Sequence, residues 1–65
     1  MVSMPIIEVK AFDRRFEDEA TARRLIEKLT DAFVEVYGEG VREETWVVLD
    51  GVSPSHWGFG GDVRD

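Results

Sequence analysis

The chain has 65 residues, no cysteine, one histidine, and 14 acidic against 8 basic side chains, which gives a net charge of −6. A chain this short forms one domain with a marginal core, and it gains stability from disulfides, a metal or self-association. The missing cysteines exclude disulfides and thiolate-bound zinc, and a single histidine excludes a multi-histidine metal site within one chain. We therefore expect self-association.

The same composition argues against two classes of partner. A strongly acidic surface repels phosphate backbones, so we expect no nucleic acid. No apolar run approaches the roughly 20 residues of a membrane span, so we expect no membrane segment. No charged-then-apolar signal segment opens the chain, and we expect a cytoplasmic protein.

The first half of the chain predicts a strand followed by an amphipathic helix. From Pro5 to Phe12, residues on one face alternate with residues on the other, which is typical of a half-buried strand. A polar break at 13–15 and an acidic cluster at 17–19 follow, and negative charge favours a helix N-terminus. Apolar residues then recur at steps of three and four as far as Tyr37, and Gly38 indicates the C-cap of a helix of about five turns.

The second half predicts a short strand and an irregular tail. A flexible return loop containing Gly40 leads to an apolar run at 45–49, which predicts a second, more buried strand that ends at Asp50 and Gly51. Ser53 followed by Pro54 indicates one helical turn. The glycine-rich segment 58–61 predicts a tight turn or small hairpin that docks on a neighbour.

The order of elements predicts an α+β fold, with a β-α-β subunit. A helical crossover of this length favours parallel strands with a right-handed connection. A lone two-stranded sheet is barely stable. Pairing with a second copy would give a four-stranded sheet backed by two helices, and we expect such a dimer.

Several short segments together resemble the 4-oxalocrotonate tautomerase family. These are Met-Pro-Ile-Ile before the first strand, an arginine just after it, the Val-Val-Leu strand, and His-Trp-Gly-Phe-Gly-Gly near the end. The resemblance covers the chain from Pro5 to about Asp62. It implies β-α-β subunits assembled as a homohexamer (a trimer of dimers) or a heterohexamer. It also implies cofactor-free proton transfer on a small 2-oxo or unsaturated carboxylic acid, or a related hydratase, dehalogenase or decarboxylase activity.

The resemblance also implies roles for individual residues. Pro5 matches the catalytic proline, which is a free N-terminus in the family, so residues 1–4 would be a leader that is absent or processed and 5–65 the domain. Arg15, or its neighbour Arg14, matches the arginine that holds a substrate carboxylate. Trp57 matches an aromatic pocket wall. Trp46 stands where the best-studied members have a second arginine, and we expect it to line the pocket as well.

Each of these residues also has a purely structural interpretation. Pro5 suits the first position of an edge strand, and the two arginines suit a solvated loop. Trp46 suits a sheet core, and Trp57 suits an anchor for the C-terminal tail. Arg42, just before the second strand, could supply a second cation from a neighbouring subunit, although a surface role is favoured. The rival functions are a non-catalytic subunit of a hetero-oligomer and a small acidic interaction module without a pocket.

Overall fold

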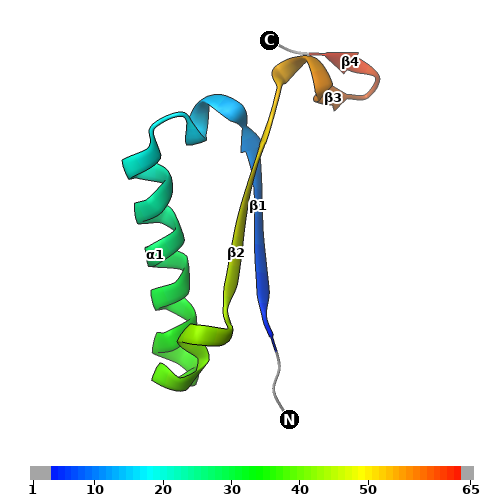
Figure 1. Ribbon diagram of the computed structural model, residues 1–65. Helices are drawn as coiled ribbons and strands as arrows, with labels where there is room; N and C mark the ends of the chain where they lie inside the picture. The colour runs from blue at the N-terminus through cyan, green and yellow to red at the C-terminus, as the bar shows by residue number, and fades with distance from the viewer. Residues whose placement is uncertain (1–3, 64–65) are drawn as a thin grey trace.

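Two parallel strands and one long helix make up most of the molecule (Figure 1). The computed structural model describes residues 4–63, so the predicted leader at 1–4 lies outside the described residues except for Met4. The elements in chain order are β1 (Ile6–Phe12), the 3₁₀ turn η1 (Asp13–Phe16), α1 (Glu19–Tyr37), the 3₁₀ helix η2 (Glu39–Glu44), β2 (Trp46–Val52), the 3₁₀ turn η3 (Pro54–His56), β3 (Gly58–Phe59) and β4 (Asp62–Val63). The predicted β-α-β order with parallel strands is confirmed.

The sheet pairs β1 with β2 in a register that runs from Ile6 opposite Trp46 to Phe12 opposite Val52. Alternate residues of each strand are half-buried, and α1 packs on that face. The prediction that Asp50 and Gly51 end the second strand is wrong, because both residues continue the parallel ladder. An ion pair of 3.1 Å between Lys10 Nζ and an Asp50 carboxylate oxygen links the strands at this point.

The second strand is also not the more buried one within a single chain. Its burial alternates like that of β1. Trp46 is 53% exposed and Val48 is 45% exposed, because both lie on the face away from α1. An apolar run can therefore look like a fully buried strand in the sequence when one of its faces is bare in the isolated chain.

Local capping interactions define the two ends of α1, as the sequence predicts. The Asp18 carboxylate accepts a hydrogen bond of 3.3 Å from the Thr21 backbone N–H, and the hydroxyl and amide donors of Thr21 lower the pKa of Asp18. At the other end, Gly38 adopts a φ of 99° and donates its N–H to the Val34 carbonyl at 2.7 Å. A positive φ favours glycine, which explains why the helix ends at this residue.

The return segment after α1 is more ordered than the sequence analysis expects. Residues 39–44 form η2, and Arg42 binds Glu39 within it. Arg42 also binds Asp31 of α1 at 3.1 Å, and the two carboxylates raise the pKa of its guanidinium. Arg42 thus links η2 to α1 at the molecular surface, where the sequence analysis favours a surface role for it.

The C-terminal segment forms the small hairpin that the sequence allows. Gly60 and Gly61 connect β3 to β4 with φ values of 59° and 93°. Positive φ at both central residues is the requirement of a type I′ hairpin turn, and glycine meets it without strain. The hairpin lies beyond the end of the sheet and away from α1 (Figure 1). It is therefore the part of the described chain that packs least on the β-α-β core.

The isolated chain lacks a closed core. Among residues 4–63, no side chain is fully buried. The accessible surface is 5268 Å², whereas a compact monomer of this mass exposes about 4,200 Å². The excess of about 1,100 Å² is larger than the roughly 800 Å² that each partner buries in a standard protein interface. The Cα radius of gyration is 14.7 Å, against about 11 Å for a compact domain of this length. One chain thus exposes more surface than a compact monomer of its size.

Candidate functional site

Pro5 stands immediately before β1, beside the first residue of β2. The Trp46 backbone N–H donates a hydrogen bond of 2.9 Å to the Pro5 carbonyl oxygen. This bond fixes Pro5 at the end of the parallel ladder, with its ring nitrogen on the side of the preceding Met4. Pro5 is half-buried, and Met4 is 51% exposed. The structure thus brings Pro5 and Trp46 together, although the two residues lie far apart in the sequence.

An apolar surface adjoins Pro5 on the sheet face away from α1. We call it the apolar patch, and it consists of Ile6, Trp46 and Val48. Ile6 is 58% exposed and lies directly opposite Trp46 in the register. Contiguous exposed apolar residues normally mark a ligand or protein contact. The Trp46 side chain is therefore exposed in the isolated chain and does not belong to a core.

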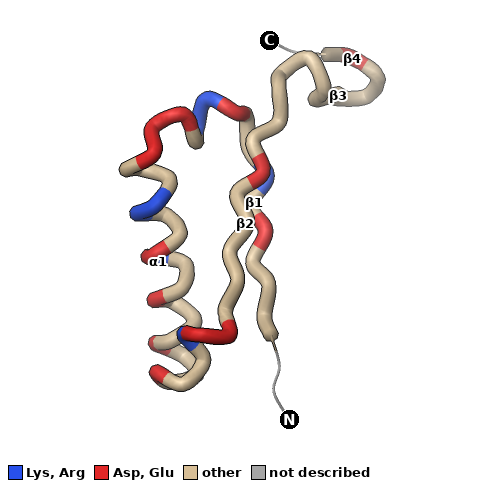
Figure 2. The backbone as a smooth tube through the Cα atoms, viewed as in Figure 1, with Lys and Arg blue, Asp and Glu red and all other residues tan. Residues whose placement is uncertain are grey.

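The two candidate arginines lie at the other end of β1. Arg14 and Arg15 both belong to η1, and both are exposed. The Arg14 guanidinium lies 5.5 Å from the centroid of the Phe12 ring, over its face. A guanidinium in this position is attracted by the ring quadrupole, which restricts its orientation. Figure 2 shows this basic segment in the bend between β1 and α1, with acidic residues on both sides of it.

Trp57 lies at the same end as the arginines. Its ring meets Phe12 edge-on, with centroids 4.7 Å apart, and stacks near Phe59 at 6.4 Å. We call these three residues the aromatic cluster. The turn η3 positions Trp57 here, because the Trp57 backbone N–H donates a hydrogen bond of 3.1 Å to the Pro54 carbonyl. The cluster and the Arg14 guanidinium combine an apolar wall with a fixed positive charge.

The sequence analysis missed two members of this arrangement. Phe12 closes the first strand, and Phe59 sits in the glycine-rich hairpin. The signal in the sequence was the pair of aromatic residues two positions apart at 57 and 59, together with an aromatic residue next to the arginines. Only the fold shows that these segments meet.

The predicted site residues therefore form two half-sites at opposite ends of the sheet. Pro5 and Trp46 make up one, and Arg14, Arg15 and Trp57 belong to the other. The strand β1 separates them, and its seven residues span about 23 Å. A small carboxylic acid is less than half as long as this strand. Within one chain, no such molecule can touch Pro5 and either arginine at once.

The basic side chain between the two half-sites, Lys10, is paired with a carboxylate. Lys10 lies midway along the exposed sheet face, and Asp50 raises the pKa of Lys10 by hydrogen bonding and by its negative charge. Arg42, near the Pro5 end of the sheet, is held by two carboxylates. In the described part of the chain, the arginines of η1 are thus the cations next to the aromatic cluster.

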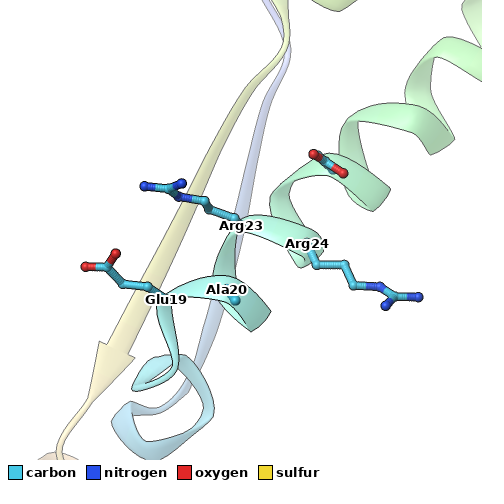
Figure 3. A pocket seen from close by; sticks show the side chains of 5 residues that line it. Glu19, Ala20, Arg23 and Arg24 are labelled. Carbon is cyan, nitrogen blue, oxygen red and sulfur yellow. The ribbon is translucent and has the colours of Figure 1, made fainter.

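A shallow hollow on the first turns of α1 does not coincide with either half-site. Its lining residues all come from that helix: Glu19, Ala20, Arg23, Arg24 and Glu27. In Figure 3, Arg23 and Arg24 point away from each other, so they do not converge on one ligand. None of the candidate site residues lines this hollow, and we assign no function to it.

Comparison with known proteins identifies the family of this chain. The model of the tautomerase enzyme family matches residues 5–64. The chain belongs to the tautomerase family. A solved structure of SAR1376 from methicillin-resistant Staphylococcus aureus, a protein provisionally assigned as a 4-oxalocrotonate tautomerase, is similar to it with a TM-score of 0.74 and 28% sequence identity. The alignment covers 92% of each chain. A comparison with curated proteins gives no significant match.

These findings confirm the resemblance and the β-α-β tautomerase fold. They do not address which residues act on a substrate. Among residues 4–63, no helix combines the length and the apolar character that crossing a membrane requires.

Proposed function

We propose that this protein is a cofactor-free tautomerase that transfers a proton within a small 2-oxo or unsaturated carboxylic acid, with Pro5 as the general base. The observation that carries the proposal is the family match, which begins at the proline itself. The position of Pro5 supports it, because the residue sits at an open end of the sheet beside an exposed aromatic wall.

Pro5 can act as a base only when its nitrogen is a free amine. In the chain that begins at Met1, Met4 precedes Pro5 and the nitrogen is an amide, which is not basic. Translation that begins at Met4, followed by removal of that methionine, gives a secondary amine. An α-amino group has a pKa near 8, and two features disfavour its ammonium form: a partly buried site, and arginines that a second chain would bring close. The amine can then accept the proton of an enol hydroxyl and return it to carbon.

We propose that the complete site forms between two copies of the chain. Because the two half-sites lie at opposite ends of the sheet, a second chain that runs in the opposite direction sets Pro5 and Trp46 of one copy against Arg14, Arg15 and Trp57 of the other. This edge-to-edge pairing gives a four-stranded sheet and leaves the apolar patch, on the face away from α1, for contacts between dimers. Three such dimers would make the hexamer that the family resemblance implies, whether the chains are identical or mixed.

The side chains available suit a particular shape of substrate. An arginine of η1 holds the carboxylate, since a guanidinium pairs with it through two parallel hydrogen bonds. The aromatic cluster and Trp46 exclude water and strengthen that interaction. Trp46 offers no positive charge, so a second carboxylate lacks a partner on this chain next to Pro5. An acid with one carboxylate and an apolar or aromatic remainder fits best.

Intact-mass measurement of the natively expressed protein and an ultraviolet assay test the proposal together. A chain that begins at Pro5 should ketonise phenylenolpyruvate, and chelators should leave the rate unchanged. The chain that begins at Met1 should be inactive. Pro5→Ala should lower the rate by roughly 100-fold or more, because the primary amine differs in pKa and shape.

Two outcomes would point elsewhere. An unchanged rate in Pro5→Ala would exclude proline as the base. A native protein that begins at Met1 and lacks activity alone would favour the non-catalytic subunit of a hetero-oligomer.

A further inference from the structure

The turn η1 sits directly on β2 at Gly51. A Cβ atom on Gly51 would lie 3.0 Å from the Asp13 Cα, 3.3 Å from the Asp13 Cβ and 3.4 Å from Cδ2 of Phe16. Carbon atoms that are not bonded to each other attract best at about 3.5–4.0 Å. The nearest of these atoms belongs to the backbone, so a side-chain rotation cannot relieve the contact. Any larger residue at position 51 must push the turn away.

The lack of space for a side chain, and not the backbone conformation, explains why position 51 is a glycine. Gly51 is not among the glycines with positive φ, which are Gly38, Gly60 and Gly61. It lies in the regular ladder of β2, opposite Ala11 of β1. Two small residues thus stand side by side near the end of the sheet, on the face that carries the turn. Glycine normally weakens the interior of a strand, so its presence at position 51 needs a reason. The close approach of the η1 backbone supplies that reason.

The turn η1, which packs against Gly51, carries the two arginines that are candidates for binding the substrate carboxylate. Asp13, which would meet the added Cβ, directly precedes Arg14 and Arg15. The position of the turn therefore sets where the Arg14 guanidinium lies relative to Phe12 and the aromatic cluster. We propose that Gly51 is a positioning residue that holds the arginines of η1 at the distance from the aromatic cluster that a carboxylate substrate requires. This inference rests on the proposed function.

The test compares an acid with its ester in the form of the protein that is active. Gly51→Ala should raise KM for phenylenolpyruvate roughly three- to tenfold, since a misplacement of about 1 Å can cost about 100-fold. It should change KM for the methyl ester by less than about twofold and leave kcat nearly unchanged, because the ester depends less on a guanidinium. A loss of folded protein would lower the apparent kcat for both compounds equally.

A matched glycine provides the control. Gly40 lies in η2, has no positive φ, and has no atom within 4 Å of the place where a Cβ would be. Gly40→Ala should leave the ratio of acid to ester KM unchanged. Where Gly51→Ala fails to fold, Phe16→Leu serves instead, because it removes the ring that lies against the same position. It should raise the KM of the acid selectively.

Two results separate this inference from the function on which it rests. Equal acid-to-ester ratios in wild type, Gly51→Ala and Phe16→Leu, with wild type active, would overturn the role of Gly51 alone. Inactivity of wild type on both compounds would overturn the proposed function. In that case, the role of Gly51 is tested by binding instead. Phenylacetate is titrated into wild type and Gly51→Ala, and the Trp57 indole NMR signal reports its affinity for each protein. Weaker binding in Gly51→Ala supports the positioning role, and equal binding refutes it.

Discussion

Two inactive variants should restore each other's activity when they assemble together. One variant is Pro5→Ala, which lacks the proposed base. The other is the double variant Arg14→Ala, Arg15→Ala, which lacks the carboxylate ligands. Each change removes a single half-site, and β1 holds the two half-sites of one chain about 23 Å apart. A working site must then combine Pro5 from one chain with the arginines from another.

The expected recovery of activity follows from the two-chain arrangement of the proposed site. Removal of the base alone should lower the rate by about 100- to 10,000-fold. In an oligomer assembled at random from equal amounts of both variants, each site has about a one-in-two chance of an intact Pro5 and about a one-in-two chance of intact arginines. About one quarter of the sites should therefore contain both, and the activity should recover to about a quarter of that of wild type.

The assay requires chains that exchange. The two variants are denatured, mixed and refolded together, and ketonisation of phenylenolpyruvate is followed at each mixing ratio. Activity should be greatest near equal amounts and should fall toward either pure variant. Each variant refolded alone serves as the control. A mixture no more active than the mean of the two pure variants would refute a site shared between chains, provided that native mass spectrometry shows assemblies that contain both variants.

Three further predictions follow from single features of the chain. Light scattering after size exclusion should give a mass above the 7.4 kDa of one chain, because no residue in 4–63 is fully buried; a folded monomer would contradict this. Trp46→Arg, once shown to fold, should raise kcat/KM on a 2-oxo dicarboxylate at least about tenfold more than on a monocarboxylate, since a fixed cation stabilises a developing enolate; equal effects would place Trp46 outside the site. Because Thr21 lowers the pKa of Asp18, the charged cap stabilises the fold above the ordinary pKa of 3.8 and loses this contribution as the pH falls through and below that value. The difference in urea midpoint between wild type and Asp18→Asn should shrink between about pH 6.5 and about pH 3, and a constant difference would exclude the carboxylate as its cause.

The first strand and the long helix could be predicted from the sequence because both depend on local signals. Alternation at 5–12 predicted β1, and the stripe that ends at Tyr37 with a glycine behind it predicted α1. The caps at Asp18 and Gly38 act on their own helix ends, so short-range chemistry is enough to find them. The motifs around Pro5 and Trp57 are local too, and they indicated the family that the comparisons confirm.

Interactions between distant segments explain where the sequence analysis fell short. The strand β2 continues past Asp50 because Lys10 and Ala11 of the neighbouring strand lie opposite residues 50 and 51. The segment 39–44 is helical because Arg42 reaches Asp31 on α1. A pattern of neighbours along the chain carries no information about either partner. Propensity is a weak guide wherever such contacts compete with it.

The arrangement of the candidate site was decided by tertiary structure alone. The sequence supplied the residue types for a base, a carboxylate ligand and two aromatic walls. It did not show that Pro5 and Trp46 lie at one end of the sheet while the arginines and Trp57 lie at the other. A strand rises about 3.3 Å for each residue, so residues that flank one straight strand are held apart by its length. Residues on parallel neighbours meet only where the register brings them together. Trp46 lies opposite Ile6, and this register lets the Trp46 N–H reach the Pro5 carbonyl.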